Sequence, residues 1–186
     1  MELQVYHYEG STTVLGKGER FALWVQGCQK ECLNCLVPDS WDLNGGTLIK
    51  VDELVEKVKN VDGVTISGGE PFLQPLALSV FLDALDEKLD VIIYSGYSYD
   101  EIVKNNSMKE LLKRVDILID GEYIDKLNYD EPLVGSSNQN IYVISDKGQD
   151  LAEYMLSLKS REVSFKIKNG ELFSIGVPPK ELEGLV

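Results

Sequence analysis

All three cysteines of this chain lie in one short stretch, as Cys28, Cys32 and Cys35 in the spacing C-x3-C-x2-C. An apolar run from Phe21 to Val25 leads directly into them, and such a run is typical of a strand buried on both faces. The cysteines are therefore expected on a loop just past the carboxyl end of a strand. Three thiolates so close in sequence can converge on one metal centre, and sulfur ligands suit zinc or iron–sulfur clusters.

The number of cysteines favours one kind of centre. A four-iron cluster is usually held by four cysteines, and this chain has no fourth. One iron would therefore stay open to another molecule, as one position does in catalytic zinc sites. A structural zinc completed by His7, the single histidine, would have an unusual ligand spacing. A disulfide would leave one cysteine over, and no other feature suggests secretion.

Length and composition describe an ordinary globular protein. The chain has 186 residues, of which 44% are hydrophobic, so we expect a single domain over residues 1–186. No apolar run approaches the roughly 20 residues that span a bilayer, and the amino terminus lacks the features of a signal peptide. We expect a cytoplasmic protein that does not bind a membrane. The net charge of −13 argues against nucleic acid as a partner.

Short apolar strands alternate with helical stripes along most of the chain. This order predicts an α/β fold with a parallel sheet and right-handed crossovers. Five parallel strands are too few to close an eight-stranded barrel, so the pattern indicates a partial (β/α) TIM-type barrel with its core at about residues 20–145. The predicted strands cover residues 21–25, 64–66, 91–94, 117–119 and 141–144, and the helical stripes begin at Val51, Leu78, Met108 and Leu151.

The remaining residues, about 146–186, are predicted to form a C-terminal extension. Apolar and polar residues alternate from Val163 to Ile167, and a second apolar run follows Asn169-Gly170. Asn-Gly between two such runs is a strong signal for a β-hairpin. Leu3 to Tyr8 forms a possible edge strand at the other end of the chain.

The chemically suggestive residues follow the predicted strands, so we expect them on one rim, where ligands of open parallel sheets bind. In the motif Ser67-Gly68-Gly69-Glu70-Pro71, two glycines let a ligand approach the backbone, and Glu70 can receive an ammonium group. A simpler interpretation is a tight strand-to-helix turn, with glycine at positive φ and proline opening the helix. Trp24 is expected in the core, and Trp41 is expected to pack the cysteine loop.

Together, the cysteine spacing and the following Gly-Gly-Glu resemble the radical S-adenosylmethionine (SAM) enzymes, whose hallmark is this combination. More narrowly, the chain is similar to the activating enzymes of anaerobic (class III) ribonucleotide reductase. The segments that carry the narrower resemblance occur in family order, and they are Leu23–Cys28, Ser40–Trp41, Ser67–Pro71, Tyr94–Tyr97, Val115–Gly121 and Gly135–Gln139.

The resemblance implies roles for individual residues. The three cysteines would ligate a [4Fe-4S] cluster, whose fourth iron chelates the amino and carboxylate groups of SAM. Gly68, Gly69 and Glu70 would receive the methionine amino group. The residues implied for SAM binding all lie near the strand-end rim, and they are Gly68, Gly69, Glu70, Ser95, Asp120, Ser136 and Asn138.

The activity implied is reductive cleavage of SAM to a 5′-deoxyadenosyl radical, which abstracts a hydrogen atom from a glycine of anaerobic ribonucleotide reductase. A flavodoxin- or ferredoxin-type protein would donate the electron. A partial barrel is open at its side and cannot alone enclose a radical, which favours a protein or peptide substrate that completes the wall. Two alternatives are a radical SAM enzyme acting on another protein or a ribosomally made peptide, and a non-catalytic metal-binding module.

The chain departs from the family pattern at three places. Asn34 stands where many radical SAM enzymes have an aromatic residue before the third cysteine. Asn140 stands where the activating enzymes often have arginine. The segment from Ile141 extends past the compact core of those enzymes.

Overall fold

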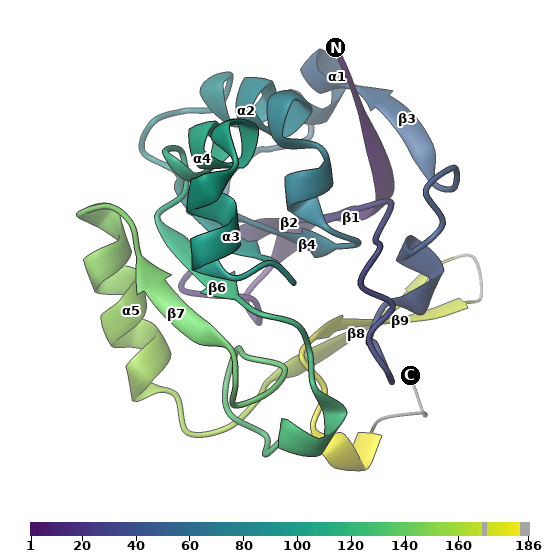
Figure 1. Ribbon diagram of the computed structural model, residues 1–186, viewed down its shortest axis with the longest axis vertical. Helices are drawn as coiled ribbons and strands as arrows, with labels where there is room; N and C mark the ends of the chain where they lie inside the picture. The colour runs from purple at the N-terminus through teal and green to yellow at the C-terminus, as the bar shows by residue number, and fades with distance from the viewer. Residues whose placement is uncertain (169–170, 183–186) are drawn as a thin grey trace.

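A computed structural model describes residues 1–168 and 171–182 of the chain. It shows a seven-stranded sheet of order β3-β1-β2-β4-β5-β6-β7 and a separate two-stranded sheet, β8-β9 (Figure 1). The strands of the large sheet are β1 (Glu2–Thr12), β2 (Arg20–Val25), β3 (Thr47–Lys50), β4 (Gly63–Gly68), β5 (Asp90–Tyr94), β6 (Ile117–Asp120) and β7 (Asn140–Val143).

The centre of the large sheet is parallel and its flanks are antiparallel. Strands β2, β4, β5 and β6 pair in parallel, whereas β1, β3 and β7 pair antiparallel with their neighbours. The α/β class is confirmed, but the prediction of a fifth parallel strand at 141–144 is wrong. Between β6 and β7 the structure has only the short 3-10 helix Asp125–Leu127, and a parallel pairing needs a longer crossover. Strand β3 was not predicted. It pairs with β1, so the expectation that Leu3 to Tyr8 forms an edge strand is wrong.

Five α-helices are seen in the described part of the chain: α1 (Val51–Val55), α2 (Pro75–Asp83), α3 (Tyr99–Lys104), α4 (Asn106–Leu112) and α5 (Lys147–Ser157). The four predicted helices are present. Helix α3 lacks a long apolar stripe, but Ser98 and Glu101 begin it with a reciprocal capping box. No helix among residues 1–168 and 171–182 is both long and apolar enough to cross a membrane.

The parallel strands are covered on both faces, which explains their nearly continuous apolar sequences. One face packs against α1 to α4 through residues such as Leu23, Ile66 and Leu118. The alternate residues form the opposite surface, here called the inner face, which includes Ala22, Trp24, Ile92, Tyr94, Ile117 and Ile119. Figure 1 shows α5 and the β8-β9 pair on the side of the sheet away from α1 and α2.

The C-terminal hairpin packs on the inner face beside β1 and β2. Strands β8 (Val163–Lys168) and β9 (Glu171–Gly176) pair antiparallel, as predicted, and the predicted Asn169-Gly170 turn lies outside the described residues. Ile175 is buried with Ala22, and the ring of Phe173 stacks on His7 at 5.3 Å between centroids. The extension therefore covers part of the sheet instead of forming a separate body.

Candidate metal and cofactor site

The three cysteine thiols line one cavity of about 160 Å³ at the carboxyl ends of the parallel strands. The cysteine loop follows β2, and the turns after β4 and β5 form further parts of the wall. Strand ends converge at one edge of a parallel sheet, so residues far apart in sequence meet there. The predicted site residues that line this cavity are Cys28, Cys32, Cys35, Gly68, Gly69, Glu70 and Ser95.

The backbone of the cysteine loop turns sharply before two of the cysteines. Glu31 has φ of 48° and precedes Cys32, and Asn34 has φ of 57° and precedes Cys35. Asparagine tolerates this left-handed conformation better than most residues, because its short side chain hydrogen-bonds locally. Asn34 therefore suits the conformation of the backbone at this position.

The thiols are available as ligands. All three cysteines are free and half-buried. The backbone N–H of Lys30 lies 3.5 Å from Cys28 Sγ, and that of Val37 lies 3.4 Å from Cys35 Sγ. Hydrogen bonds of this kind to sulfur also tune iron–sulfur clusters.

Burial raises the pKa of the Cys28 and Cys32 thiols, so metal binding must release protons from them. No group of three or more His, Cys, Asp or Glu side chains within the described residues is arranged to hold a single metal ion. The three thiols surround one cavity that has room for a bound group. This set of ligands fits a cluster that is held by three thiolates and keeps one position open.

The glycines after β4 allow two backbone segments to approach closely. A Cβ on Gly69 would lie 2.3 Å from the carbonyl oxygen of Gly27, and a Cβ on Gly68, whose φ is +99°, would lie 2.6 Å from the backbone of Val25. The amides of Gly69 and Glu70 donate to Val25 and Gly27, both at 2.8 Å. The turn interpretation of this motif is therefore correct in geometry, and the turn also forms a wall of the cavity.

Glu70 connects the turn after β4 with the turn after β5. Its side chain is 1% exposed and accepts hydrogen bonds from the Phe72 amide at 2.9 Å, the Ser95 hydroxyl at 2.9 Å and the Gly96 amide at 2.7 Å. Burial raises the pKa of Glu70 to about 7, and these hydrogen bonds oppose the rise. The carboxylate is thus held in one orientation before any ligand is present.

Lys30 fastens the cysteine loop to the opposite side of the cavity. Its ammonium group lies 2.9 Å from a carboxylate oxygen of Glu122 and 4.5 Å from the centre of the Tyr97 ring. Burial lowers the pKa of Lys30, and the ion pair with Glu122 more than offsets that effect. Sequence reasoning missed this residue, because its partner is 92 positions away.

Asp120 does not line the cavity. Its carboxylate accepts hydrogen bonds from the Tyr99 amide at 2.6 Å and from the backbone and side-chain nitrogens of Asn140 at 3.2 and 3.1 Å. Because side chains alternate along a strand, Asp120 shares the helix-covered face with Leu118. The next residue, Gly121, does line the cavity.

Ser136 and Asn138 also lie behind the cavity wall. The Ser136 hydroxyl accepts from the Ile124 amide at 3.0 Å, and the Asn138 side-chain nitrogen donates to the Glu122 carbonyl at 2.8 Å. The Asn138 Oδ1 atom is buried without a hydrogen-bond partner among the described residues. These two residues fix the loops whose neighbouring positions, Gly135 and Gln139, line the cavity.

Several lining residues were not predicted for the site. Trp24 lies half-buried on the inner face instead of in the helix-covered core, and Trp41 joins it at the cavity. The alternation of Trp24 with Leu23 and Val25 was a usable signal for this placement. The other unpredicted lining residues include Lys30, Tyr123, Gln139, Gly176 and Val177.

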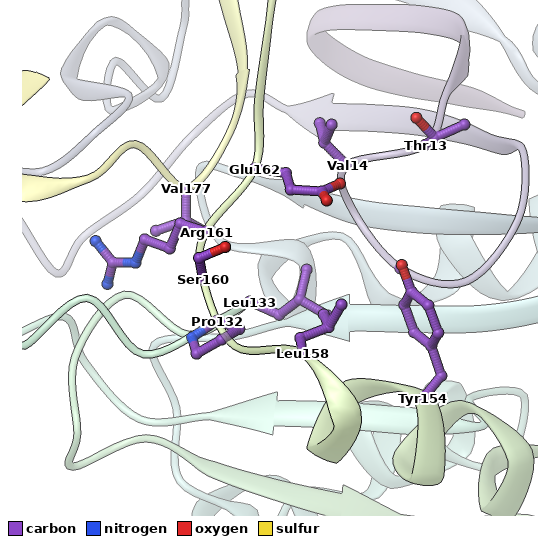
Figure 2. Close-up of a pocket in the computed structure, with 11 residues that line it drawn as sticks. Thr13, Val14, Pro132, Leu133, Tyr154, Leu158, Ser160, Arg161, Glu162 and Val177 are labelled. Carbon is purple, nitrogen blue, oxygen red and sulfur yellow. The ribbon is translucent and has the colours of Figure 1, made fainter.

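A second, much smaller cavity lies away from the cysteines. Figure 2 shows its lining side chains, which come from the segment before β2, the segment around Pro132, the segment around the end of α5 and Val177 after β9. Its volume is about 10 Å³, which leaves room for roughly one water molecule. It contains none of the predicted site residues.

Comparison with known proteins gives a consistent result. Residues 14–142 match the family model described as a 4Fe-4S single cluster domain. The anaerobic ribonucleoside-triphosphate reductase-activating protein of Salmonella typhimurium is 30% identical over 155 residues, which cover 75% of this chain and 98% of the relative. The Escherichia coli (strain K12) protein of that name is 30% identical over 153 residues, 74% of this chain and 97% of the relative.

A relative with a different name has similar identity. The pyruvate formate-lyase-activating enzyme of Staphylococcus epidermidis is 32% identical over 162 residues, which cover 80% of this chain and 64% of the relative.

Proposed function

The chain belongs to the 4Fe-4S single cluster domain family, and on that premise we propose that it is a radical SAM enzyme that activates a glycyl radical enzyme. The cavity lined by the three cysteines carries this proposal. The similarity to reductase-activating and lyase-activating proteins supports it. The proposed enzyme is a single domain whose sheet works as a partial (β/α) TIM-type barrel with the cavity on its inner side.

In this proposal the cysteines hold a [4Fe-4S] cluster with one iron open to SAM. When bound and reduced, such a cluster would supply the one electron for reductive cleavage of SAM, the chemistry that leads to hydrogen abstraction from the substrate. Cys28, Cys32 and Cys35 release their protons on binding the metal. The half-buried positions of the three cysteines limit the access of water to the bound group.

Further residues are proposed to bind SAM. Glu70 is oriented by its three hydrogen bonds, and its carboxylate borders the cavity, where it attracts the methionine ammonium group. Gly68, Gly69 and Ser95 provide the adjoining wall.

Three of the predicted residues affect the site indirectly. We propose that Asp120, Ser136 and Asn138 shape the site through the loops that they hold, since their side chains contact those loops and they do not line the cavity.

The proposed substrate is a glycine residue of anaerobic ribonucleotide reductase. A second candidate is a pyruvate formate-lyase-like enzyme, because the similarity to that activating enzyme is of the same size. The electron donor proposed is a flavodoxin- or ferredoxin-type protein, and the compartment is the cytoplasm.

The test starts with anaerobic reconstitution with iron and sulfide, followed by reduction with and without SAM. We expect about four irons per chain, a SAM-dependent change in the cluster's EPR signal, and release of 5′-deoxyadenosine. Adding each candidate partner enzyme should then identify the substrate by its glycyl radical signal. A chain that holds zinc and leaves SAM intact would instead be a structural metal-binding module.

A further inference from the structure

A buried arginine in the C-terminal extension is hydrogen-bonded to two parts of the wall around the cavity of the three cysteines, here called the cysteine cavity. Arg161 lies between α5 and β8, beyond the residues 14–142 that the family model matches. Its side chain is only 1% exposed. A guanidinium has five N–H donors, and its charge is costly to bury unless these donors are paired. The partners of Arg161 therefore show which parts of the structure it holds.

Three of these partners are backbone carbonyls of one turn. The Arg161 guanidinium donates to the carbonyl oxygens of Glu131 at 3.0 Å, Val134 at 2.8 Å and Gly135 at 3.1 Å. None of the three residues lies in a helix or a strand, and buried backbone carbonyls need a partner. Gly135 lines the cysteine cavity. Arg161 therefore fixes a part of the cavity wall from behind.

The same guanidinium also holds the segment that follows β9. It donates to the Pro178 carbonyl at 2.7 Å, and Val177, the residue before Pro178, lines the cysteine cavity. The Asp130 carboxylate pairs with Arg161 at 3.2 Å and accepts a hydrogen bond from the Lys180 amide at 2.8 Å. Arg161 therefore joins two wall segments that lie far apart in sequence.

The turn that Arg161 holds has a strained backbone. Leu133 has φ of 62°, a left-handed conformation that residues with a Cβ rarely adopt. Such a conformation persists only where the surrounding structure fixes it. Besides the bonds from Arg161, the Tyr94 hydroxyl donates to the Leu133 carbonyl at 2.7 Å. Loss of the guanidinium should let the turn relax and displace Gly135.

Little free space surrounds this contact. Arg161 lines the small second cavity together with Leu133 and Val177 (Figure 2). The volume of that cavity is only about 10 Å³. In closely packed surroundings, a change in one side chain is felt by its neighbours. A substitution at Arg161 should therefore affect the position of the wall.

We propose that Arg161 is a positioning residue for the cofactor, which holds the Gly135 and Val177 parts of the wall in the arrangement that binds SAM. This inference deepens the proposed function and rests on it, because it takes SAM as the ligand of the cavity. Arg161 does not itself line the cysteine cavity, so it acts through the wall. None of its five hydrogen bonds described above reaches the cysteine loop, so we expect the metal centre to assemble without it.

Tryptophan fluorescence tests the position of the wall in the metal-free protein. The chain has two tryptophans, Trp24 and Trp41, and both line the cysteine cavity. Arg161→Met keeps a long side chain and removes the hydrogen-bond donors. We expect acrylamide to quench the emission of this variant about twofold more strongly than that of the wild type, because a loosened wall opens more often. This measurement needs neither iron nor SAM.

The reconstituted protein gives a second measurement. In Arg161→Met we expect the same iron content as in the wild type, a KM for SAM raised about tenfold, and a kcat for release of 5′-deoxyadenosine changed by less than about twofold. Arg161→Lys keeps the charge but has three donors instead of five. It should therefore give quenching and KM values between those of the wild type and Arg161→Met. It also provides the test if Arg161→Met does not fold.

Arg20→Lys is the matched control. Arg20 is also buried, and its guanidinium donates to the Thr65 hydroxyl at 2.6 Å and to the Val64 carbonyl at 2.9 Å, but it does not line the cysteine cavity. This variant should be less stable in urea, with quenching and KM for SAM like those of the wild type. An equal rise of both quantities in Arg20→Lys would show a general loss of stability and overturn the inference.

Wild-type quenching and KM in both Arg161 variants would also overturn it. Release of 5′-deoxyadenosine by the wild type, measured in parallel, tests the proposed function separately. If that product forms while the Arg161 variants behave like the wild type, only the role of Arg161 is wrong. A wild-type protein that leaves SAM intact would overturn the proposed function, and with it the choice of SAM as the ligand.

Discussion

The backbone amide of Glu70 donates a hydrogen bond to the carbonyl of Gly27 at 2.8 Å, and so joins the turn after β4 to the residue before the first cysteine. The same glutamate accepts three hydrogen bonds through its carboxylate, two of them from the turn after β5. One residue therefore connects three strand ends. The geometry of the cysteine loop depends on the Gly-Gly-Glu turn even before any cofactor is bound.

Replacing Gly69 by alanine should disturb the cysteine loop. The new Cβ would lie 2.3 Å from the Gly27 carbonyl oxygen, so the two backbones must separate. We expect a loss of about 1–3 kcal/mol in the free energy of unfolding and a marked fall in iron bound after reconstitution. Urea unfolding and iron analysis measure both. Gly10→Ala is the control, since its Cβ would meet nothing within 4 Å. Normal iron content in Gly69→Ala would contradict this account.

The contribution of Glu70 to the stability of the metal-free protein should fall as the pH rises. Its pKa is about 7 in the folded protein against an ordinary value of 4.5, so the folded state holds the proton more tightly. The resulting stabilisation is fully present below pH 4.5 and is lost as the pH rises through 7, by up to about 3 kcal/mol. Urea unfolding between pH 4 and 8 should show this slope in the wild type.

Glu70→Gln should have a flatter pH profile over the same range. It should also be less stable at low pH by about 1–3 kcal/mol, because an amide cannot accept all three hydrogen bonds. Parallel profiles for wild type and variant would mean that Glu70 is not the group that titrates.

Lys30 and Glu122 should be energetically coupled. Each single charge reversal, Lys30→Glu or Glu122→Lys, should speed the loss of iron from the reconstituted protein to a chelator. The double reversal should restore part of the retention. Because Glu122 is 52% exposed, we expect a coupling of no more than about 1 kcal/mol. The exposed Lys113–Glu110 pair is a matched control and should not affect iron loss. Additive effects of the two reversals at the cavity would show that the pair does not hold the loop.

Asn34 should tolerate glycine but not valine. Its φ of 57° is accessible to glycine, whereas a β-branched residue pays about 1–2 kcal/mol or more there. We expect Asn34→Gly to bind iron like the wild type and Asn34→Val to bind less, measured as iron per chain after reconstitution. Loss of iron binding in both variants would mean that the asparagine side chain itself contacts the bound group.

The parts of this fold that were predictable are those governed by local pattern. Continuous apolar runs identified β2, β4, β5 and β6, and the meeting of their carboxyl ends placed the cysteines near Glu70 and Ser95. The position of Trp24 on the inner face and that of Asp120 on the helix-covered face could be predicted from two-residue alternation.

Other features depend on long-range packing that no local pattern encodes. The direction of β7 depends on the missing crossover helix, and the ion pair of Lys30 joins residues 92 positions apart. The place of Gly176 in the cavity depends on where the hairpin docks, which follows from the burial of Ile175.

Part of the cavity wall comes from residues near the end of the sequence, and this affects the order in which the cavity forms during synthesis. Cys35 is translated long before Gly176 and Val177, which line the same cavity. During synthesis the cysteine loop and its neighbouring strand ends can form while that part of the wall is still missing. Contacts between such distant parts of a chain form slowly. The order of synthesis therefore leaves an interval in which the cysteine loop has formed and the wall made by Gly176 and Val177 has not.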